Sequence, residues 1–281
     1  MATDETPNAD QIAYWNEAGG AVWVEMQERF DRMTAPFGRK VVDVLAPRPG
    51  ERLLDIGCGS GGSTLELARL VGPGGQVLGV DVSAPMLGLA RRRAAEAGLD
   101  NVRFVEADAQ TARIEPGGYD GLFSRFGVMF FDDPVGAFTN LHGALQPGGR
   151  LAFVCWRAMA ENGWATVALA AALPHLPPMP APVPGTPGAF AFADPDRIRG
   201  ILGRAGFSGV AVTPFDTKAG VGDLDQTVEL MLRSGPVGSA LREHADRRDA
   251  VAAAVRKALA PHETAEGILL DTAAWIVTGR A

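Results

Sequence analysis

Cysteine, histidine and clustered basic residues are scarce in this chain of 281 residues. Its two cysteines, Cys58 and Cys155, form no Cys-x-x-Cys pair, which argues against a disulfide framework. The four histidines include no pair at metal-ligand spacing, so no metal site is expected. Lysine and arginine total 26 against 33 acidic residues, and the net charge of -7 argues against a nucleic-acid partner, which requires clustered cations.

Long apolar runs and a positively charged leader are also missing. No apolar stretch approaches the ~20 residues that a membrane-spanning helix needs, and the first residues are polar and acidic, unlike a secretory signal. With no disulfide pattern, these features predict a cytoplasmic protein without a membrane span. A Gly-x-Ser-x-Gly elbow is absent as well, which excludes one class of hydrolase.

The composition is that of a globular protein, and the apolar pattern divides the chain into three regions. Hydrophobic residues make up 47% of the chain and charged residues 21%. Apolar spacing predicts a helical cap or lid over residues 1–46, with helices divided at Pro36 and Gly38. Strands and helices then alternate over residues 47–157, which predicts a doubly wound α/β core with a mostly parallel sheet. Residues 158–281 are expected to complete this sheet.

A glycine-rich segment, Leu53–Gly62, follows an apolar strand and precedes a helical pattern. Gly57, Gly59 and Gly62 satisfy the Gly-x-Gly-x-x-Gly pattern, in which glycines let the backbone approach a ligand beside a helix N-terminus. Asp81 follows Gly62 by 81 − 62 = 19 residues and ends the second strand, where its carboxylate can accept both ribose hydroxyls. Dinucleotide-binding enzymes share both features, so the segment by itself indicates only a nucleotide-like ligand.

Three further features separate the candidate ligands. Asp55 stands two residues before the first glycine, where its carboxylate can face the amino group of a methionine moiety or can shape the loop from behind. Asp108 and Ala109 end the third strand, where they can hydrogen-bond an adenine ring. A tight Pro-Gly-Gly turn at residues 147–149 precedes the fifth strand. Together these features favour a ligand that carries methionine and adenine over a dinucleotide.

Five motifs in this order resemble those of the class I S-adenosylmethionine (SAM)-dependent methyltransferase family. They are LLDIGCGSG at 53–61, VLGVDVSAPML at 77–87, FVEADAQ at 104–110, YDGLFSRFGVMFF at 119–131 and LQPGGRLAFV at 145–154. The chain is most similar to the small-molecule branch that includes the ubiquinone- and menaquinone-pathway methyltransferases. The resemblance covers the central part of the chain more specifically than its two ends.

The resemblance implies a Rossmann-like sheet of seven strands whose last strand is antiparallel. Residues 209–215 and 268–277 would then be the sixth and seventh strands, and residues 223–260 a helical insertion between them. A proline-rich loop is expected at residues 174–187, before the sixth strand.

The resemblance also implies an enzyme that transfers the methyl group of SAM to a small, hydrophobic or aromatic acceptor by in-line substitution at oxygen, nitrogen or carbon. The product would be S-adenosylhomocysteine (SAH). Because the sulfonium is already activated, the protein mainly aligns nucleophile, methyl and sulfur. Two alternatives stay open: an NAD(P)-dependent oxidoreductase that uses the same glycines with Asp81, and a protein that binds SAM without catalysis. A small-molecule partner is expected, and the sequence does not choose between a monomer and a homodimer.

Candidate residues fall into two parts of a site. The cofactor-binding candidates are Asp55, Gly57, Gly59, Asp81, Val82, Met86, Asp108, Ala109, Ser124 and Arg125. The candidates for the acceptor pocket or its lid are Trp15, Trp23, Trp156, Arg157 and Trp164. A general base is needed only when the acceptor is poorly ionised, and no residue pair suggests one. His175, beside the proline-rich loop, and Arg125 are the catalytic candidates.

Overall fold

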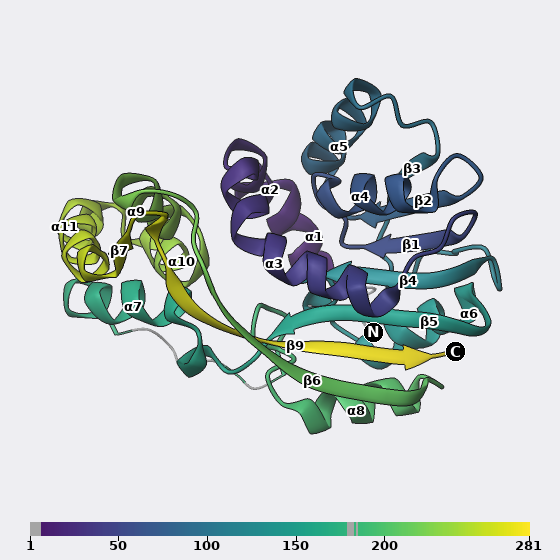
Figure 1. Cartoon of the computed structure of the whole chain (residues 1–281). Coiled ribbons are helices and arrows are strands. Elements are labelled where there is room, and N and C mark those ends of the chain that lie inside the picture. Colours follow the sequence, from purple (N-terminus) through teal and green to yellow (C-terminus); the bar gives the residue numbers. More distant parts are fainter. Residues whose placement is uncertain (1–6, 179–182, 184) are drawn as a thin grey trace.

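The computed structural model describes residues 7–178, 183 and 185–281 (Figure 1). Its main strands are β1 (Arg52–Ile56), β2 (Gln76–Asp81), β3 (Val102–Glu106), β4 (Tyr119–Arg125), β5 (Leu145–Trp156), β6 (Ser208–Ala219) and β9 (Leu270–Arg280). Within the described residues these seven strands form one sheet in the order β3-β2-β1-β4-β5-β9-β6. A separate short hairpin consists of β7 (Glu263–Thr264) and β8 (Gly267–Ile268). Part of the proline-rich loop predicted at 174–187, residues 179–182 and 184, lies outside the described residues.

The five strands β3, β2, β1, β4 and β5 are parallel, and β9 runs antiparallel to both of its neighbours, β5 and β6. This arrangement confirms the predicted sheet with an antiparallel last strand. The strands predicted at 209–215 and 268–277 correspond to β6 and β9. The carboxyl ends of the parallel strands meet at one edge, which is where ligands bind in open α/β sheets.

Helices cover both faces of the sheet. The helices of the α/β core are α4 (Gly62–Val71), α5 (Ala84–Glu96), α6 (Pro134–Ala144) and α8 (Pro195–Arg204). The chain moves from β1 to β2 in one direction and from β4 to β5 in the other, so right-handed crossovers place α4 and α6 on opposite faces. Ser83, Asp133 and Asp194 accept backbone hydrogen bonds at the starts of α5, α6 and α8, which fixes where these helices begin.

Three helices precede the sheet: α1 (Ala9–Asn16), α2 (Ala18–Glu25) and α3 (Gln27–Leu45). The predicted division at Pro36 and Gly38 is wrong, because α3 runs through both residues. A proline inside a helix costs about 3 kcal/mol, but α3 packs an apolar face that includes Phe37 and Val41 against β4 and β5. Burial of that face stabilises the helix more than the proline destabilises it. Gly38 leaves room for Arg125, whose Cδ would lie 3.2 Å from an added Cβ.

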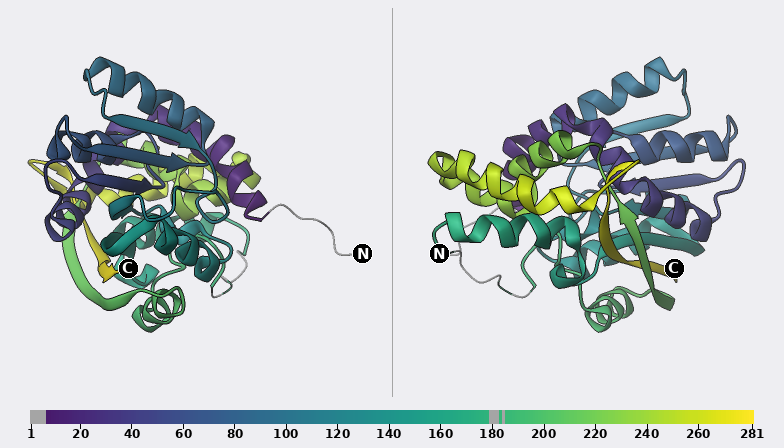
Figure 2. Two further views of the ribbon diagram at one scale, coloured as in Figure 1. Left: turned by 90° about the vertical axis from the view of Figure 1, so that its right-hand side faces the viewer. Right: turned by 60° about the vertical axis from the view of Figure 1, so that its left-hand side comes forward.

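The predicted helical insertion before the last strand is confirmed. It contains α9 (Leu224–Arg233), α10 (Gly235–Glu243) and α11 (Arg248–Leu259), which pack with α7 (Gly163–Ala172). These helices share a second apolar core, in which Val228 and Val251 are buried. Figure 2 shows the insertion (green to yellow) beside the N-terminal helices (purple), and the ion pair between Glu25 and Arg233 joins α2 to α9.

Short 3-10 turns connect several of these elements. They are η1 (Val128–Phe130), η2 (Met159–Glu161), η3 (Leu173–His175), η4 (Ala245–Arg247) and η5 (Ala260–His262). Since η1 follows β4, it carries Met129 and Phe130 to the carboxyl edge of the sheet. In the ranges that the structure describes, no helix has the length and apolar character that a membrane crossing requires.

Candidate active site

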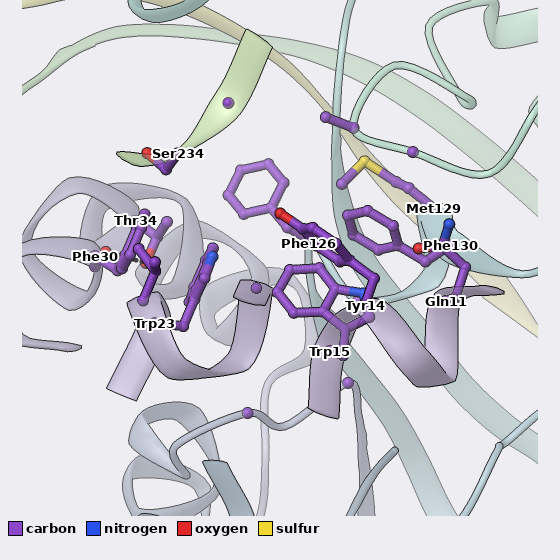
Figure 3. Close-up of a pocket in the computed structure, with 18 of the residues that line it drawn as sticks. Gln11, Tyr14, Trp15, Trp23, Phe30, Thr34, Phe126, Met129, Phe130 and Ser234 are labelled. Carbon is purple, nitrogen blue, oxygen red and sulfur yellow. Dashed lines mark hydrogen bonds between the residues drawn. The ribbon is translucent and has the colours of Figure 1, made fainter. Parts of the chain in front are cut away.

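A cavity of about 550 Å³ opens at the carboxyl ends of the parallel strands. Its wall combines loops that follow β1 to β5 with the N-terminal helices, residues 187–190, and helices α9 and α10. A cavity of this size can enclose a small organic ligand. Figure 3 shows part of the wall, where Trp15, Trp23 and Phe126 surround the same space.

The loop after β1 requires glycine at two of the predicted positions. Gly57 and Gly59 have φ values of 66° and 53°, in the left-handed region. A Cβ at Gly57 would lie 2.5 Å from the Cα of Gly127, and a Cβ at Gly59 would lie 2.6 Å from the Cε of Met86. The amide of Gly57 donates to the carbonyl of Val80 at 2.9 Å, which ties the loop to β2. Both glycines line the cavity, so a ligand can approach bare backbone.

Asp81 ends β2 and lines the cavity beside this loop. Its carboxylate accepts the backbone amides of Gly59 (to Oδ2, 2.7 Å) and Ser83 (to Oδ1, 2.9 Å). Burial raises the pKa of the Asp81 carboxyl, and the backbone donors oppose that rise. Each carboxylate oxygen has a further lone pair, so the group can still accept two ribose hydroxyls.

Asp108, after β3, offers an unused acceptor. Its Oδ1 accepts the amide of Gln110 at 2.9 Å, whereas its buried Oδ2 makes no hydrogen bond within the described residues. A buried acceptor without a partner costs about 1–3 kcal/mol, which a donor on a ligand would recover. Burial raises the pKa of the Asp108 carboxyl, and the Gln110 amide and the nearby Asn8 side chain oppose that rise. Val82, Met86 and Ala109 line the same end of the cavity and give it an apolar surface.

Asp55 lies beneath the glycine loop and outside the cavity wall. It is fully buried, and its Oδ2 accepts the hydroxyls of Ser63 (2.8 Å) and Thr64 (2.6 Å) in the first turn of α4. These bonds agree with the alternative, that Asp55 shapes the loop from behind, whereas its buried Oδ1 has no hydrogen-bond partner within the described residues, so the contact with a methionine amino group stays a prediction. Burial raises the pKa of the Asp55 carboxyl to about 6, although the two hydroxyls favour its ionised form.

Ser124 also holds the loop and does not face the cavity. It is fully buried, its Oγ donates to the carbonyl of Ile56 at 2.7 Å, and the same Oγ accepts the amide of Gly127 at 3.2 Å. Ser124 is not part of the cavity wall, so the backbone contact with a cofactor that the sequence predicted for it stays a prediction. Its bonds keep Gly127 against Gly57, the close approach that excludes a side chain there.

Arg125, at the end of β4, does line the cavity, and Asp31, an aspartate that no sequence motif marked, lies against it. Asp31 belongs to α3 and pairs with Arg125 (Oδ1 to Nη2, 2.9 Å) and with Arg93 of α5 (Oδ2 to Nη2, 3.0 Å). Arg93 also donates to the carbonyl of Ser60 at 2.7 Å. The N-terminal helices, the glycine loop and the end of β4 therefore meet at one charged cluster, which only the three-dimensional structure brings together.

Aromatic side chains dominate the other end of the cavity (Figure 3). Four tryptophans that the sequence proposed for a pocket or lid line the cavity: Trp15, Trp23, Trp156 and Trp164. Trp23 stacks on Phe30 with ring centroids 3.9 Å apart, and Trp156 stacks on Phe126 at 4.0 Å. Phe126 has a φ of 62°, which is unusual for a bulky residue and directs its ring onto Trp156. This end of the cavity, here called the acceptor end, is suited to a flat, apolar molecule.

Arg157 and His175 lie outside the cavity wall, so its geometry does not support the acceptor and catalytic roles predicted for them. The Arg157 guanidinium pairs with Asp216 at 2.8 Å and with Glu161, and it lies 4.8 Å from the ring centroid of Trp275. His175 is exposed in η3 and is not part of the cavity wall.

Several residues of the acceptor end were not expected from the sequence. They are Tyr14, Phe126, Met129, Phe130, Phe190, Leu230, Met231, Ser234 and Val237. Phe126 and Phe130 lie within the motif at 119–131, where apolar residues are more often part of the core than of a pocket, and their position after the fourth strand is a usable signal. Nothing in the sequence of α9 and α10 marks their residues as part of a pocket, because these helices have the ordinary apolar periodicity of a packed bundle.

No imidazole or lysine amine lines the cavity among the described residues. His142 packs edge-on against Phe207, with ring centroids 4.9 Å apart, and lies outside the wall. The cavity can therefore hold and orient an acceptor, but it offers that acceptor no neutral nitrogen base.

Comparison with known proteins shows where this chain belongs. Residues 53–149 match the family model described as a methyltransferase domain. A demethylmenaquinone methyltransferase from Thermus thermophilus is 33% identical over 178 residues, which are 60% of this chain and 80% of that protein. An aklanonic acid methyltransferase from a Streptomyces species is 40% identical over 118 residues, which are 42% of this chain and 54% of that protein. The chain thus matches about half the length of this second relative.

The fold also matches solved structures. The YcgJ protein of Bacillus subtilis superposes with a TM-score of 0.59, covering 86% of this chain and 97% of that one. The two sequences are only 16% identical in this superposition, so the similarity concerns the fold alone.

Proposed function

Since the chain belongs to the class I SAM-dependent methyltransferases of the small-molecule type, we propose that it methylates a small, largely hydrophobic aromatic acceptor with SAM. The observation that carries this proposal is the single cavity with two unlike ends. One end presents the glycine loop, Asp81 and the unused acceptor of Asp108, and the other end is walled by aromatic rings. A methyl donor and an apolar acceptor need such neighbouring sites.

The residues at the first end suit SAM. Asp81 would hold the ribose hydroxyls, the free Oδ2 of Asp108 would accept the adenine amino group, and Val82, Met86 and Ala109 would contact the ring. Because Gly57 and Gly59 have no side chain, the cofactor can lie against the backbone of the loop. When bound, SAM supplies a methyl group on a positively charged sulfur, which needs no further activation.

The chain's own contribution is orientation and exclusion of water. The stacked pair Phe126 and Trp156 and the neighbouring Trp164 would hold a flat acceptor beside the cofactor, and such placement replaces a bimolecular encounter by an aligned one. Because the described part of the wall offers no imidazole or lysine to take a proton, we expect an acceptor atom that is nucleophilic by itself. An acidic phenol, an enol or an activated carbon meets that condition.

The test is SAH release from SAM with a panel of phenols, quinols and amines, including demethylmenaquinone and aklanonic acid, the acceptors named in two relatives. We expect turnover with at least one hydrophobic aromatic member. Asp81→Ala should weaken SAM binding by on the order of 10-fold or more, because charge-assisted hydrogen bonds are lost. NAD binding without SAM binding would overturn the proposal, and SAM binding without turnover on the panel would favour a non-catalytic role.

We also propose a cytoplasmic location. Cys58 and Cys155 are both free and buried, and thiols persist in a reducing compartment. Cell fractionation checks this, and recovery of the protein outside the cytoplasmic fraction would contradict it.

A further inference from the structure

The proposed function leaves one part of the cofactor without a partner, its charged amino-acid end. Among the described residues, the carboxylates that line the cavity are those of Asp31, Asp81 and Asp108. The strand order β3-β2-β1-β4 places Asp108, then Asp81, then the glycine loop, then Arg125 along the edge of the sheet. Asp31 contacts Arg125 at the β4 end of this row, and it also pairs with Arg93 of α5.

Asp31 is held in place by residues from three elements. Its Oδ1 meets Nη2 of Arg125 at 2.9 Å, and its Oδ2 meets Nη2 of Arg93 at 3.0 Å and accepts a hydrogen bond from Gln27. The carboxylate stands over the start of α4, where its oxygens would lie 2.9 Å and 3.2 Å from a Cβ added to Gly62. Asp31 and Arg125 both line the cavity, so a ligand can reach an anion and a cation side by side.

A second observation at the same place points to a ligand. The hydroxyl of Ser60 lines the cavity, is buried and has no hydrogen-bond partner within the described residues. Helix α4 begins at Gly61 and Gly62 without a side-chain cap. Free donors beside an adjacent anion and cation suit a zwitterion, which carries one ammonium and one carboxylate.

We propose that Asp31 binds the ammonium group and Arg125 the carboxylate group of the cofactor's amino-acid end. This inference rests on the proposed function and gives the ammonium contact to Asp31, on the N-terminal helix α3, because Asp31 lines the cavity and Asp55 does not. The salt bridge between Asp31 and Arg125 is thereby replaced by two ion pairs, one from each residue to the ligand. Cofactor binding then also fixes α3, whose Phe30 and Thr34 line the cavity beside Asp31.

A purely structural tether between α3 and β4 is the competing role for Asp31. The two roles differ in which ligands respond to substitution. A tether would affect every ligand of the cavity equally, whereas an ammonium partner affects only ligands that carry the ammonium group.

The experiment is calorimetric titration of the whole protein with three ligands: SAH, decarboxylated SAH, which keeps the ammonium group, and 5′-methylthioadenosine, which has neither charged group. Asp31→Asn should weaken SAH and decarboxylated SAH by about 10-fold or more and change 5′-methylthioadenosine by less than about 2-fold. Arg125→Gln should weaken SAH alone. Glu28→Gln, an exposed change on the same helix, serves as the matched control and should alter none of the three.

Equal weakening of all three ligands by Asp31→Asn, or no weakening of any, would overturn the inference. If Asp31→Asn does not fold, the Arg125→Gln arm and the wild-type protein still decide, because the wild type must bind decarboxylated SAH more tightly than 5′-methylthioadenosine. A wild-type protein that binds 5′-methylthioadenosine but shows no gain from the ammonium group refutes the role of Asp31 and leaves the proposed function intact. Failure to bind any of the three refutes the proposed function itself.

Discussion

The two ends of the cavity are built in different ways. The cofactor end comes from consecutive loops after β1, β2 and β3, and backbone hydrogen bonds to Val80 and Asp81 fix its shape. The acceptor end collects side chains from the N-terminal helices, from the ends of β4 and β5, from residues 187–190 and from the insertion. One end depends on backbone geometry in a short stretch of sequence, and the other depends on packing between distant segments. Substitutions should therefore act differently at the two ends.

The largest effect is expected at the glycine loop. Gly57→Ala adds left-handed strain of about 1–2 kcal/mol and places a Cβ 2.5 Å from the Cα of Gly127, so the backbone has to shift. We expect at least about a 100-fold loss of SAH affinity by calorimetry, together with lower stability to urea. Gly98→Ala is the matched control, because its φ of 63° is similar but nothing lies within 4 Å of the added Cβ. Equal behaviour of the two variants would show that the close backbone approach is unimportant.

The buried carboxyl beneath the loop should give the next largest effect, seen as a dependence on pH. The pKa of Asp55 is about 6 in the folded protein against an ordinary value of 3.8, so the native state binds this proton more tightly than the unfolded chain. Stability relative to Asp55→Asn should therefore fall as pH rises from about 4 to about 6, by up to about 3 kcal/mol, and stay level above that range. Urea unfolding of both proteins at several pH values measures this difference. A difference that is constant with pH would contradict the burial effect.

At the acceptor end, Trp164→Ala should weaken binding of the acceptor without weakening binding of the cofactor. Trp164 stacks on Phe190 with ring centroids 5.6 Å apart and contacts Trp156 at 5.2 Å, so its loss removes part of the acceptor wall. We expect the KM of the acceptor to rise by about 10-fold, while the affinity for SAH, which serves as the internal control, changes by less than about 2-fold. A parallel loss of both affinities would mean that the ends are mechanically coupled.

The smallest effect is expected where the insertion meets the N-terminal helices. Glu25→Gln removes the exposed ion pair with Arg233, which lowers the pKa of the Glu25 carboxyl through a hydrogen bond and charge attraction. Exposed pairs contribute little and are screened by salt, so we expect a change of about 2-fold in the acceptor KM at low ionic strength that disappears at about 0.5 M salt. An effect that persists at high salt would show that the contact between Glu25 and Arg233 contributes more than charge attraction.

The cofactor end could be predicted from the sequence because its chemistry depends on fixed spacing. Gly57, Gly59 and Asp81 stand at set distances from strand ends, and those distances persist when the sheet forms. Asp55 shows the limit of this reasoning, since the spacing gives its position along the chain but not whether its carboxylate faces the ligand or the helix behind it. Only the structure shows that its Oδ2 is engaged by the hydroxyls of Ser63 and Thr64 on that helix.

The acceptor end and the path of α3 could not be predicted in the same way. Local propensity favours a break at Pro36, but contact with strands that follow much later in the chain keeps α3 continuous. Asp31 becomes a candidate only when α3 lies against Arg125 and Arg93, which come from two other elements. Such contacts between distant residues produce no pattern of fixed spacing in the sequence that could be recognised.

The position of β9 between β5 and β6 sets an order of assembly. In the described part of the chain β6 pairs with β9 alone, so it stays unpaired while the residues of α9, α10 and α11 are synthesised. Closing this edge joins segments that are far apart in the chain, which makes it a slow, late step in folding. During that interval the insertion can pack its own helices around Val228 and Val251, and strands β3, β2, β1 and β4, which do not pair with β9, can form their part of the sheet. The protein would then gain its cofactor end before its acceptor end.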